Sequence, residues 1–217
     1  MTRPLLSLEQ AMTLGPVIPV LVIDRVDDAV PLARALLVGG VNTLEVTLRT
    51  PVAMDVIRVL AAEVPQAVIL AGTITTPEQW EAAHHAGAHF GVSPGLTPRL
   101  LSALRSGSPM PLLPGVATAS ELMTAMDAGL HCFKFFPAQQ AGGVGMLKAF
   151  HSPFPDALFC PTGGISPDNA RTYLDLPNVA CVGGSWLAPS AAVKAGQWDH
   201  ITALAQAAST LMQPMQC

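Results

Sequence analysis

Charged side chains are scarce in this sequence. Only 12% of the 217 residues are Asp, Glu, Lys or Arg, and the formal net charge is -4. A protein that binds nucleic acid or an anionic membrane surface normally concentrates positive charge, so we expect neither partner. Half of the residues are hydrophobic, which predicts a large and well-covered core.

Long apolar segments are also missing. The most apolar stretch, residues 17–23, is far shorter than the ~20 residues that a membrane helix needs, and Pro19 interrupts it. The N-terminus carries Arg3, Pro4 and Pro16 but no compact apolar block followed by small residues. We therefore expect no membrane helix and no signal peptide.

Cysteine is rare and unclustered. Cys132, Cys160 and Cys181 fall within predicted strands, Cys217 is terminal, and no Cys-x-x-Cys motif occurs. This pattern is typical of reduced, packed thiols in a cytoplasmic protein, and it disfavours a disulfide framework or a zinc site.

The histidines do not form a recognisable metal motif. His84, His85 and His89 are close in sequence, but Gly87 interrupts the predicted helix between them and no carboxylate stands at ligand spacing. A metal-dependent carbonyl lyase needs His and carboxylate ligands that converge at strand ends. We therefore expect no metal ion and no other cofactor.

What the sequence does contain is a regular alternation of strand-like and helix-like segments. Strands are predicted about every twenty to twenty-six residues, the length that a strand, a crossover helix and two short loops require. They begin near Val17, Asn42, Ala67, His89, Pro111, His131, Ala157 and Val179. Helices are predicted over residues 27–38, 52–64, 77–86, 97–104, 119–128, 144–150, 167–174 and 199–212.

This alternation predicts a (β/α)₈ TIM barrel, preceded by a short helix over residues 5–14, in a single domain that spans residues 1–217. The alternative is an open doubly wound sheet, which usually carries Gly-x-Gly-x-x-Gly after its first strand. Here the first strand is followed by Asp24-Arg25-Val26-Asp27-Asp28. The barrel is therefore favoured.

The second predicted strand alternates polar and apolar side chains. One of its faces presents Thr43, Glu45, Thr47 and Arg49. An exposed edge strand would show the same alternation, but the outer face of a barrel strand packs on helices and must be apolar. In a barrel, Glu45 and Arg49 would therefore lie inside, where charges are costly unless they are paired or used.

The sixth predicted strand, within residues 130–137, places Lys134 between Phe133 and Phe135. A buried ammonium group must find a counter-charge, reach water or lose its proton. The lysine of an edge strand would snorkel to solvent. A neutral amine, by contrast, is a nucleophile that forms an imine with a carbonyl compound.

Lys134, Glu45 and Arg49 would divide the work of a carbonyl reaction if all three face the interior. The amine attacks a ketone, the carboxylate moves protons, and the guanidinium holds a substrate carboxylate with two hydrogen bonds. The sequence therefore predicts a site directed at a keto acid.

Glycine pairs follow the last two predicted strands, at Gly163-Gly164 and Gly183-Gly184. A single pair is often only a tight turn. After the seventh and eighth strands of a barrel, however, backbone N–H groups that glycine exposes commonly hold a phosphate, with a helix N-terminus behind them. Ser185 would add a hydroxyl donor. Thr73 and Pro94 stand at the ends of the third and fourth strands as weaker candidates.

Motifs spread over nearly the whole chain resemble one family, the 2-keto-3-deoxy-6-phosphogluconate (KDPG) aldolases. These are class I, pyruvate-type aldolases that also act on 2-keto-4-hydroxyglutarate. The matching motifs are Gly15-Pro16-Val17-Ile18-Pro19-Val20, Glu45-Val46-Thr47-Leu48-Arg49-Thr50, Ala71-Gly72-Thr73, Ser93-Pro94-Gly95-Leu96-Thr97, Phe133-Lys134-Phe135-Phe136-Pro137-Ala138, Pro161-Thr162-Gly163-Gly164-Ile165-Ser166 and Gly183-Gly184-Ser185-Trp186.

The resemblance implies a role for each matching residue. It implies Lys134 as the imine-forming lysine and Glu45 as the acid/base. For the remaining site it implies carboxylate binding by Arg49 and Thr73, pocket walls from Pro94 and Phe136, and phosphate binding by Gly163, Gly164, Gly184 and Ser185, with Thr162 beside them.

The resemblance also implies the reaction and its setting. A metal-free (β/α)₈ homotrimer in the cytoplasm would cleave KDPG, a phosphorylated keto acid, to pyruvate and glyceraldehyde 3-phosphate in the Entner–Doudoroff route. The related aldolase for the galactonate analogue shares the lysine but lacks the arginine, so Arg49 favours the gluconate substrate. The loop Gln139-Gln140-Ala141 departs from the family pattern, which affects substrate preference at most.

Two other functions stay open at this level. A phosphosugar isomerase or epimerase would use the terminal glycines for phosphate and Lys134 as an electrostatic helper. A catalytically silent phosphate-binding module would use the glycines alone. Such a module would have little reason to keep Glu45, Arg49 and Lys134 unpaired inside a barrel.

Overall fold

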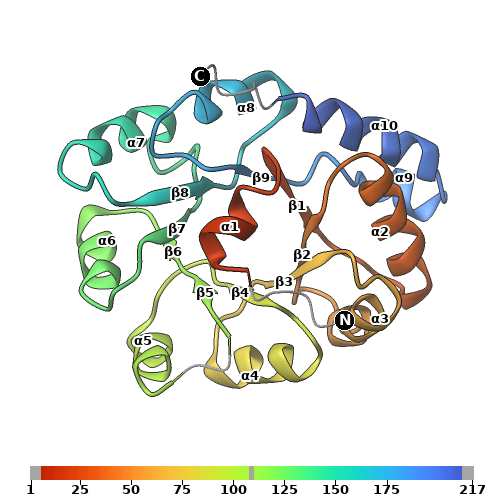
Figure 1. The fold of residues 1–217 in the computed structure, drawn as a ribbon, viewed down its shortest axis with the longest axis horizontal. Helices are drawn as coiled ribbons and strands as arrows, with labels where there is room; N and C mark the ends of the chain where they lie inside the picture. The colour runs from red at the N-terminus through yellow and green to blue at the C-terminus, as the bar shows by residue number, and fades with distance from the viewer. Residues whose placement is uncertain (1–5, 108–109, 212–217) are drawn as a thin grey trace.

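Strands and helices alternate along the chain, as the sequence predicts. The computed structural model describes residues 6–107 and 110–211. In Figure 1 the strands surround the centre of the molecule, the helices lie outside them, and the first helix lies over the centre. Within the described residues, no helix is long and apolar enough to cross a membrane.

The strands form parallel, curled sheets. One sheet has the order β5-β4-β3-β2-β1-β9 and the other has the order β6-β7-β8. Single parallel bridges, Phe159 to Val179 and Thr162 to Gly183, link β8 to the segment that contains β9. The strands are β1 (Val17–Leu21), β2 (Thr43–Thr47), β3 (Val68–Gly72), β4 (Phe90–Val92), β5 (Leu112–Leu113), β6 (Gly115–Val116), β7 (Cys132–Phe135), β8 (Leu158–Pro161) and β9 (Val182–Gly184).

The predicted fifth strand is divided into β5 and β6 at Pro114. Proline has no N–H to donate to a neighbouring strand, so it interrupts a ladder of hydrogen bonds. Its carbonyl still accepts from the Lys134 N–H at 2.9 Å. β5 therefore pairs with β4 while β6 pairs with β7.

Helices cover the outer face of the sheets, except for the first helix, α1. The helices are α1 (Leu8–Met12), η1 (Val26–Asp28), α2 (Ala29–Val38), α3 (Ala53–Glu63), α4 (Pro77–His85), α5 (Pro98–Arg105), α6 (Ala119–Met126), α7 (Gly143–His151), α8 (Pro167–Leu174), α9 (Ser190–Lys194) and α10 (Trp198–Ser209). The hydroxyls of Thr76, Thr97 and Thr118 cap α4, α5 and α6 by accepting a backbone N–H of the first turn.

Two predicted helices extend beyond the described residues, and one helix was not predicted. The first helix begins at Leu8, and the predicted start at Leu5 lies outside the described residues. The last helix ends at Ser209, and its predicted end at Met212 also lies outside them. α9 was not predicted, because five residues are too few to show a helical period.

The sheets separate two apolar layers. On the outer face, Phe133, Phe135 and Phe159 pack with Phe150 of α7, with ring centroids 5.8 to 6.4 Å apart. On the inner face, a cluster formed by Ile18, Val68, Leu70, Phe90, Val92, Leu113, Cys160 and Cys181 packs against Ala11 and Met12 of α1. Helix α1 therefore fills the inside of the curled sheet at the amino-terminal ends of its strands.

Candidate active site

Lys134 lies on the inner face of β7 and meets a carboxylate from β2, a strand of the other sheet. Its Nζ donates to Oε1 of Glu45 at 3.0 Å, and the two residues are 6% and 3% exposed. The ring centroid of Phe136 lies 5.4 Å from the same Nζ. Lys134 therefore has the counter-charge that a buried ammonium group needs, and its side chain does not extend to solvent.

Glu45 is held in place by the strand that carries it. Leu44 and Val46, on either side of it, are buried in the outer core. Two inner-face neighbours have partners of their own: Thr43 donates to the Ala11 carbonyl at 3.3 Å, and Thr47 donates to the Leu21 carbonyl at 2.7 Å. The Glu45 carboxylate is thus left to pair with Lys134.

A buried pair of this kind needs a reason. Desolvation of two charges roughly cancels their attraction, so a buried ion pair adds little to stability compared with apolar side chains of similar size. An amine and a carboxylate in hydrogen-bond contact can, however, exchange a proton and so produce a neutral nucleophile. The pair is therefore better suited to chemistry than to holding the fold.

Arg49 does not lie inside the sheet, contrary to the sequence prediction. β2 ends at Thr47, and Arg49 is exposed in the following turn. The last ladder bond at this end runs from the Leu48 N–H to the Gly72 carbonyl, at 2.8 Å. Among the described residues, the Arg49 side chain has no ion pair. Arg49 therefore stands at the carboxyl-terminal end of β2 with its guanidinium available.

The other predicted site residues gather at the same end of the sheet. Because the strands are parallel, their carboxyl-terminal ends form one rim. Thr73 follows β3, Pro94 follows β4 and Phe136 follows β7. After β8 come Thr162, Gly163 and Gly164. Gly184 is the last residue of β9, and Ser185 follows it. Thr162 and Gly184 are buried, Ser185 and Gly164 are exposed, and the others are partly buried.

Thr73 has an unusual backbone. Its φ is 63°, a left-handed value that is rare for a residue with a branched Cβ. Such conformations persist only where the surrounding structure enforces them, and they cluster at functional sites. Thr73 stands directly after Gly72, the last residue of β3, which pairs with Thr47 at the end of β2. Arg49 lies in the turn after that end of β2.

The two glycine-rich loops lie next to each other. Gly163 and Gly164 have φ values of 102° and 75°, which glycine adopts without strain. The Gly164 carbonyl accepts from Asn169 Nδ2 at 2.9 Å, and Ser166 caps α8 directly after the loop. The bridge between Thr162 and Gly183 joins this loop to β9. Backbone N–H groups and a helix N-terminus thus lie together, which is the arrangement that favours an anion.

Comparison with known proteins decides the family. Residues 8–204 match the model of the KDPG and KHG aldolases. The chain belongs to this family. The resemblance found in the sequence is therefore confirmed, as is the α/β fold with a curled parallel sheet.

Relatives align with this KDPG/KHG aldolase family member over nearly its full length. It is 55% identical to the 2-dehydro-3-deoxy-phosphogluconate aldolase of Pseudoalteromonas atlantica and 54% identical to the KHG/KDPG aldolase of Escherichia coli. Each alignment covers 93% of this chain and 94% of the relative. A crystal structure of the KDPG aldolase from Legionella pneumophila, with pyruvate captured as a covalent carbinolamine, superposes with a TM-score of 0.90. That protein is 51% identical, over 93% of this chain and 97% of the other.

Two inner-face glycines of this aldolase make room for residues of the site, a role that was not predicted from the sequence. A Cβ built on Gly183 would lie 2.9 Å from Cγ2 of Thr162. Gly115 is the register partner of Lys134. A Cβ built on it would lie 2.8 Å from the Gly95 N and would also strike the Pro94 carbonyl. Both glycines therefore admit groups from site loops. A glycine within a strand is the available signal of such close approach, but it does not identify the partner.

The three described cysteines are free, as predicted, and Cys217 lies outside the described residues. Burial, followed by the Glu9 carboxylate, raises the pKa of Cys132 to about 11. A hydrogen bond with Cys160, followed by burial, raises the pKa of Cys181. Among the described residues, no three His, Cys, Asp or Glu side chains group as metal ligands.

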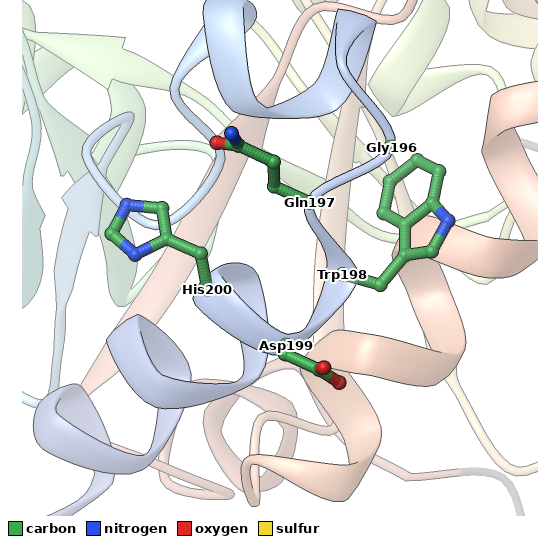
Figure 2. A pocket seen from close by; sticks show the side chains of 5 residues that line it. All are labelled: Gly196, Gln197, Trp198, Asp199 and His200. Atoms are coloured by element: carbon green, nitrogen blue, oxygen red, sulfur yellow. The ribbon is translucent and has the colours of Figure 1, made fainter.

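A surface depression lies elsewhere, where α9 meets α10 (Figure 2). Residues 196–200 line it, and none of the predicted site residues does. Figure 2 shows Gln197 and His200 directed to one side of this chain segment and Trp198 and Asp199 to the other. The side chains do not converge, so the depression has no chemical resemblance to the Lys134 site.

The raised pKa of Cys132 predicts low thiol reactivity. A shift from the usual 9.0 to about 11 leaves about 100-fold less thiolate, the reactive form, at pH 8. Between pH 9 and about 11 the folded protein keeps the Cys132 proton while the unfolded protein has lost it. The free energy of unfolding is therefore unaffected by this group below pH 9 and falls as the pH rises through about 11. In a Cys217→Ser variant, a chromogenic disulfide should label the native protein slowly at pH 8 and the unfolded protein fast. Rapid native labelling that Cys132→Ser removes would contradict this prediction.

Proposed function

We propose that this protein is a class I aldolase that cleaves KDPG to pyruvate and glyceraldehyde 3-phosphate through a Schiff base on Lys134. The observation that carries the proposal is the buried contact between Lys134 and Glu45. The names of its relatives at 54% and 55% identity support the substrate. The double name of the E. coli relative supports a second reaction, cleavage of 4-hydroxy-2-oxoglutarate to pyruvate and glyoxylate.

The chemistry begins with a proton transfer. Lys134 gives a proton to Glu45 across their 3.0 Å hydrogen bond, and the neutral amine adds to the C2 ketone of the substrate. The carbinolamine hydroxyl takes this proton back from Glu45 and leaves as water, which produces an iminium ion and restores the Glu45 carboxylate. Burial of the amine beside the Phe136 ring excludes competing solvent.

Bond cleavage then uses the iminium ion as an electron sink. Glu45, as a carboxylate, takes the proton of the C4 hydroxyl, directly or through a water molecule. The electron pair of the C3–C4 bond moves into the iminium, which leaves an enamine on Lys134 and releases the aldehyde. Protonation of the enamine at C3 and addition of water then free pyruvate and restore the amine.

The carboxylate end of the substrate falls to the rim beside β2 and β3. We assign the substrate carboxylate to Arg49 and Thr73, and the walls of the pocket to Pro94 and Phe136. The exposed Arg49 is free of ion pairs within the described residues, so a bidentate contact with a carboxylate costs no existing pair. We place C2, the carbon next to the carboxylate, at the Lys134 amine, beside the Phe136 ring.

The phosphate end falls to the loops after β8 and β9. We assign it to the backbone N–H groups of Gly163, Gly164 and Gly184 and to the Ser185 hydroxyl, with Thr162 lining the site. The left-handed glycines and the N-terminus of α8 support this assignment.

The architecture of the whole chain is part of the proposal. We infer a closed (β/α)₈ barrel in one domain over residues 1–217, with β5 and β6 acting as one interrupted strand. The bridges between β8 and the β9 segment support closure. Following the family resemblance, we also assign a homotrimer in the cytoplasm that uses no cofactor and binds neither nucleic acid nor membrane.

Loss of the Lys134 amine should abolish both turnover and imine trapping. Lys134→Met keeps most of the buried volume but removes the nucleophile. Wild-type protein treated with pyruvate and borohydride should gain the mass of a reduced pyruvyl adduct, and Lys134→Met should not. Lys148→Met, an exposed lysine of α7, is the matched control. No adduct on the wild-type protein would refute the proposal and favour an isomerase or a silent binding module.

Loss of the Glu45 negative charge should separate proton transfer from imine formation. Glu45→Gln keeps the shape of the side chain but cannot accept the hydroxyl proton. Turnover of KDPG should fall by about 10²- to 10⁴-fold, while pyruvate and borohydride should still label Lys134, more slowly, because water can take the amine proton in place of Glu45. Steady-state kinetics and mass spectrometry measure the two effects. If turnover barely changes, another group is the base.

Removal of the Arg49 guanidinium should chiefly weaken substrate binding. Arg49→Ala should raise the KM for KDPG with a smaller change in kcat, since the lost contact is present in both ground and transition states. The concentration of pyruvate that gives half-maximal trapping should rise in parallel. Arg58→Ala, which removes an exposed arginine of α3, should leave both unchanged. An unaltered dependence on pyruvate would make Arg49 a structural residue.

A further inference from the structure

Gly72, the last residue of β3, lies directly against the Glu45 side chain. A Cβ built on Gly72 would be 2.7 Å from Cγ and 2.9 Å from Cδ of Glu45, and it would also strike Oε1. The three nearest atoms all belong to this one side chain. The space that a side chain at residue 72 would need is therefore already occupied by the proposed acid/base.

The backbone cannot move away to make room. Thr47 pairs with Gly72 in the parallel register of β2 and β3, and the Leu48 N–H donates to the Gly72 carbonyl at 2.8 Å. Glu45 sits in the same ladder opposite Leu70. Any added atom at residue 72 must consequently displace the Glu45 side chain and lengthen its contact with Lys134.

Space is the reason for glycine here. The φ angle of Gly72 is not positive, so alanine can adopt the same backbone conformation. A substitution by alanine thus changes one thing, the room left for the Glu45 carboxylate. This separates Gly72 from Gly163 and Gly164, whose left-handed backbones need glycine in any case.

We propose that Gly72 is a positioning residue, whose missing side chain lets Glu45 extend from β2 along β3 to reach Lys134. Its consequence for turnover rests on the proposed aldolase function, because Glu45 matters there as the proton acceptor. A displacement of about 1 Å in a reacting group can cost about 100-fold in rate. Gly72→Ala should therefore lower the rate of catalysis by displacing the Glu45 carboxylate.

The experiment is a double-mutant cycle of Gly72→Ala with Glu45→Ala. Gly72→Ala alone should lower kcat for KDPG by about 10- to 100-fold and should also lower the Tm. In the Glu45→Ala background the clash is gone, so Gly72→Ala should change neither kcat nor Tm further. Gly145→Ala is the control, because a Cβ on this exposed residue of α7 meets nothing within 4 Å.

Each outcome decides the matter. Undiminished kcat in Gly72→Ala, or equal losses of kcat with and without Glu45, would overturn the positioning role. If Gly72→Ala does not fold but the double variant does, the steric part of the proposal stands, and failure of both overturns it. If the wild-type protein forms no pyruvyl adduct, the aldolase function fails, yet the Tm cycle still tests the contact between Gly72 and Glu45.

Discussion

The candidate active site depends on one contact, the 3.0 Å hydrogen bond between the Lys134 amine and the Glu45 carboxylate. The two groups come from strands of different sheets, and both are buried. Such a pair costs nearly as much desolvation energy as it returns. The surrounding residues therefore have to hold it in place: the Thr43 and Thr47 hydroxyls have other acceptors, and α1 fills the space below.

Each strand of the site has separate tasks on its two faces. Phe133 and Phe135 anchor β7 in the outer aromatic core while Lys134, between them, serves the inside. Leu44 and Val46 do the same for Glu45 on β2. Reactive groups carried on packed strands keep their geometry better than groups on loops. The rim residues, by contrast, lie on turns, where changes in loop sequence can alter substrate preference without disturbing the pair.

Much of this could be read from the sequence, because alternation along a strand has a strict period of two. That rule correctly placed Glu45 and Lys134 on the inner face. It failed for Arg49, since periodicity does not reveal that β2 ends at Thr47. It also could not show that Gly72 and Gly183 face the Glu45 and Thr162 side chains, because a contact between strands depends on register. The sequence predicts one fifth strand, and the structure divides it at Pro114, because proline cannot donate a backbone hydrogen bond to a neighbouring strand.

The position of α1 has a consequence for the order of events. Its residues Ala11 and Met12 pack against the inner apolar cluster, so the inside of the sheet is filled at the amino-terminal ends of the strands, and the carboxyl-terminal rim is the side left for the substrate. In the proposed reaction, the water that releases pyruvate reaches Lys134 from the same rim that the aldehyde leaves by. In the proposed order of steps the enamine remains on Lys134 after the aldehyde has left, so until C3 is protonated another aldehyde at this rim can add there and form a new carbon–carbon bond.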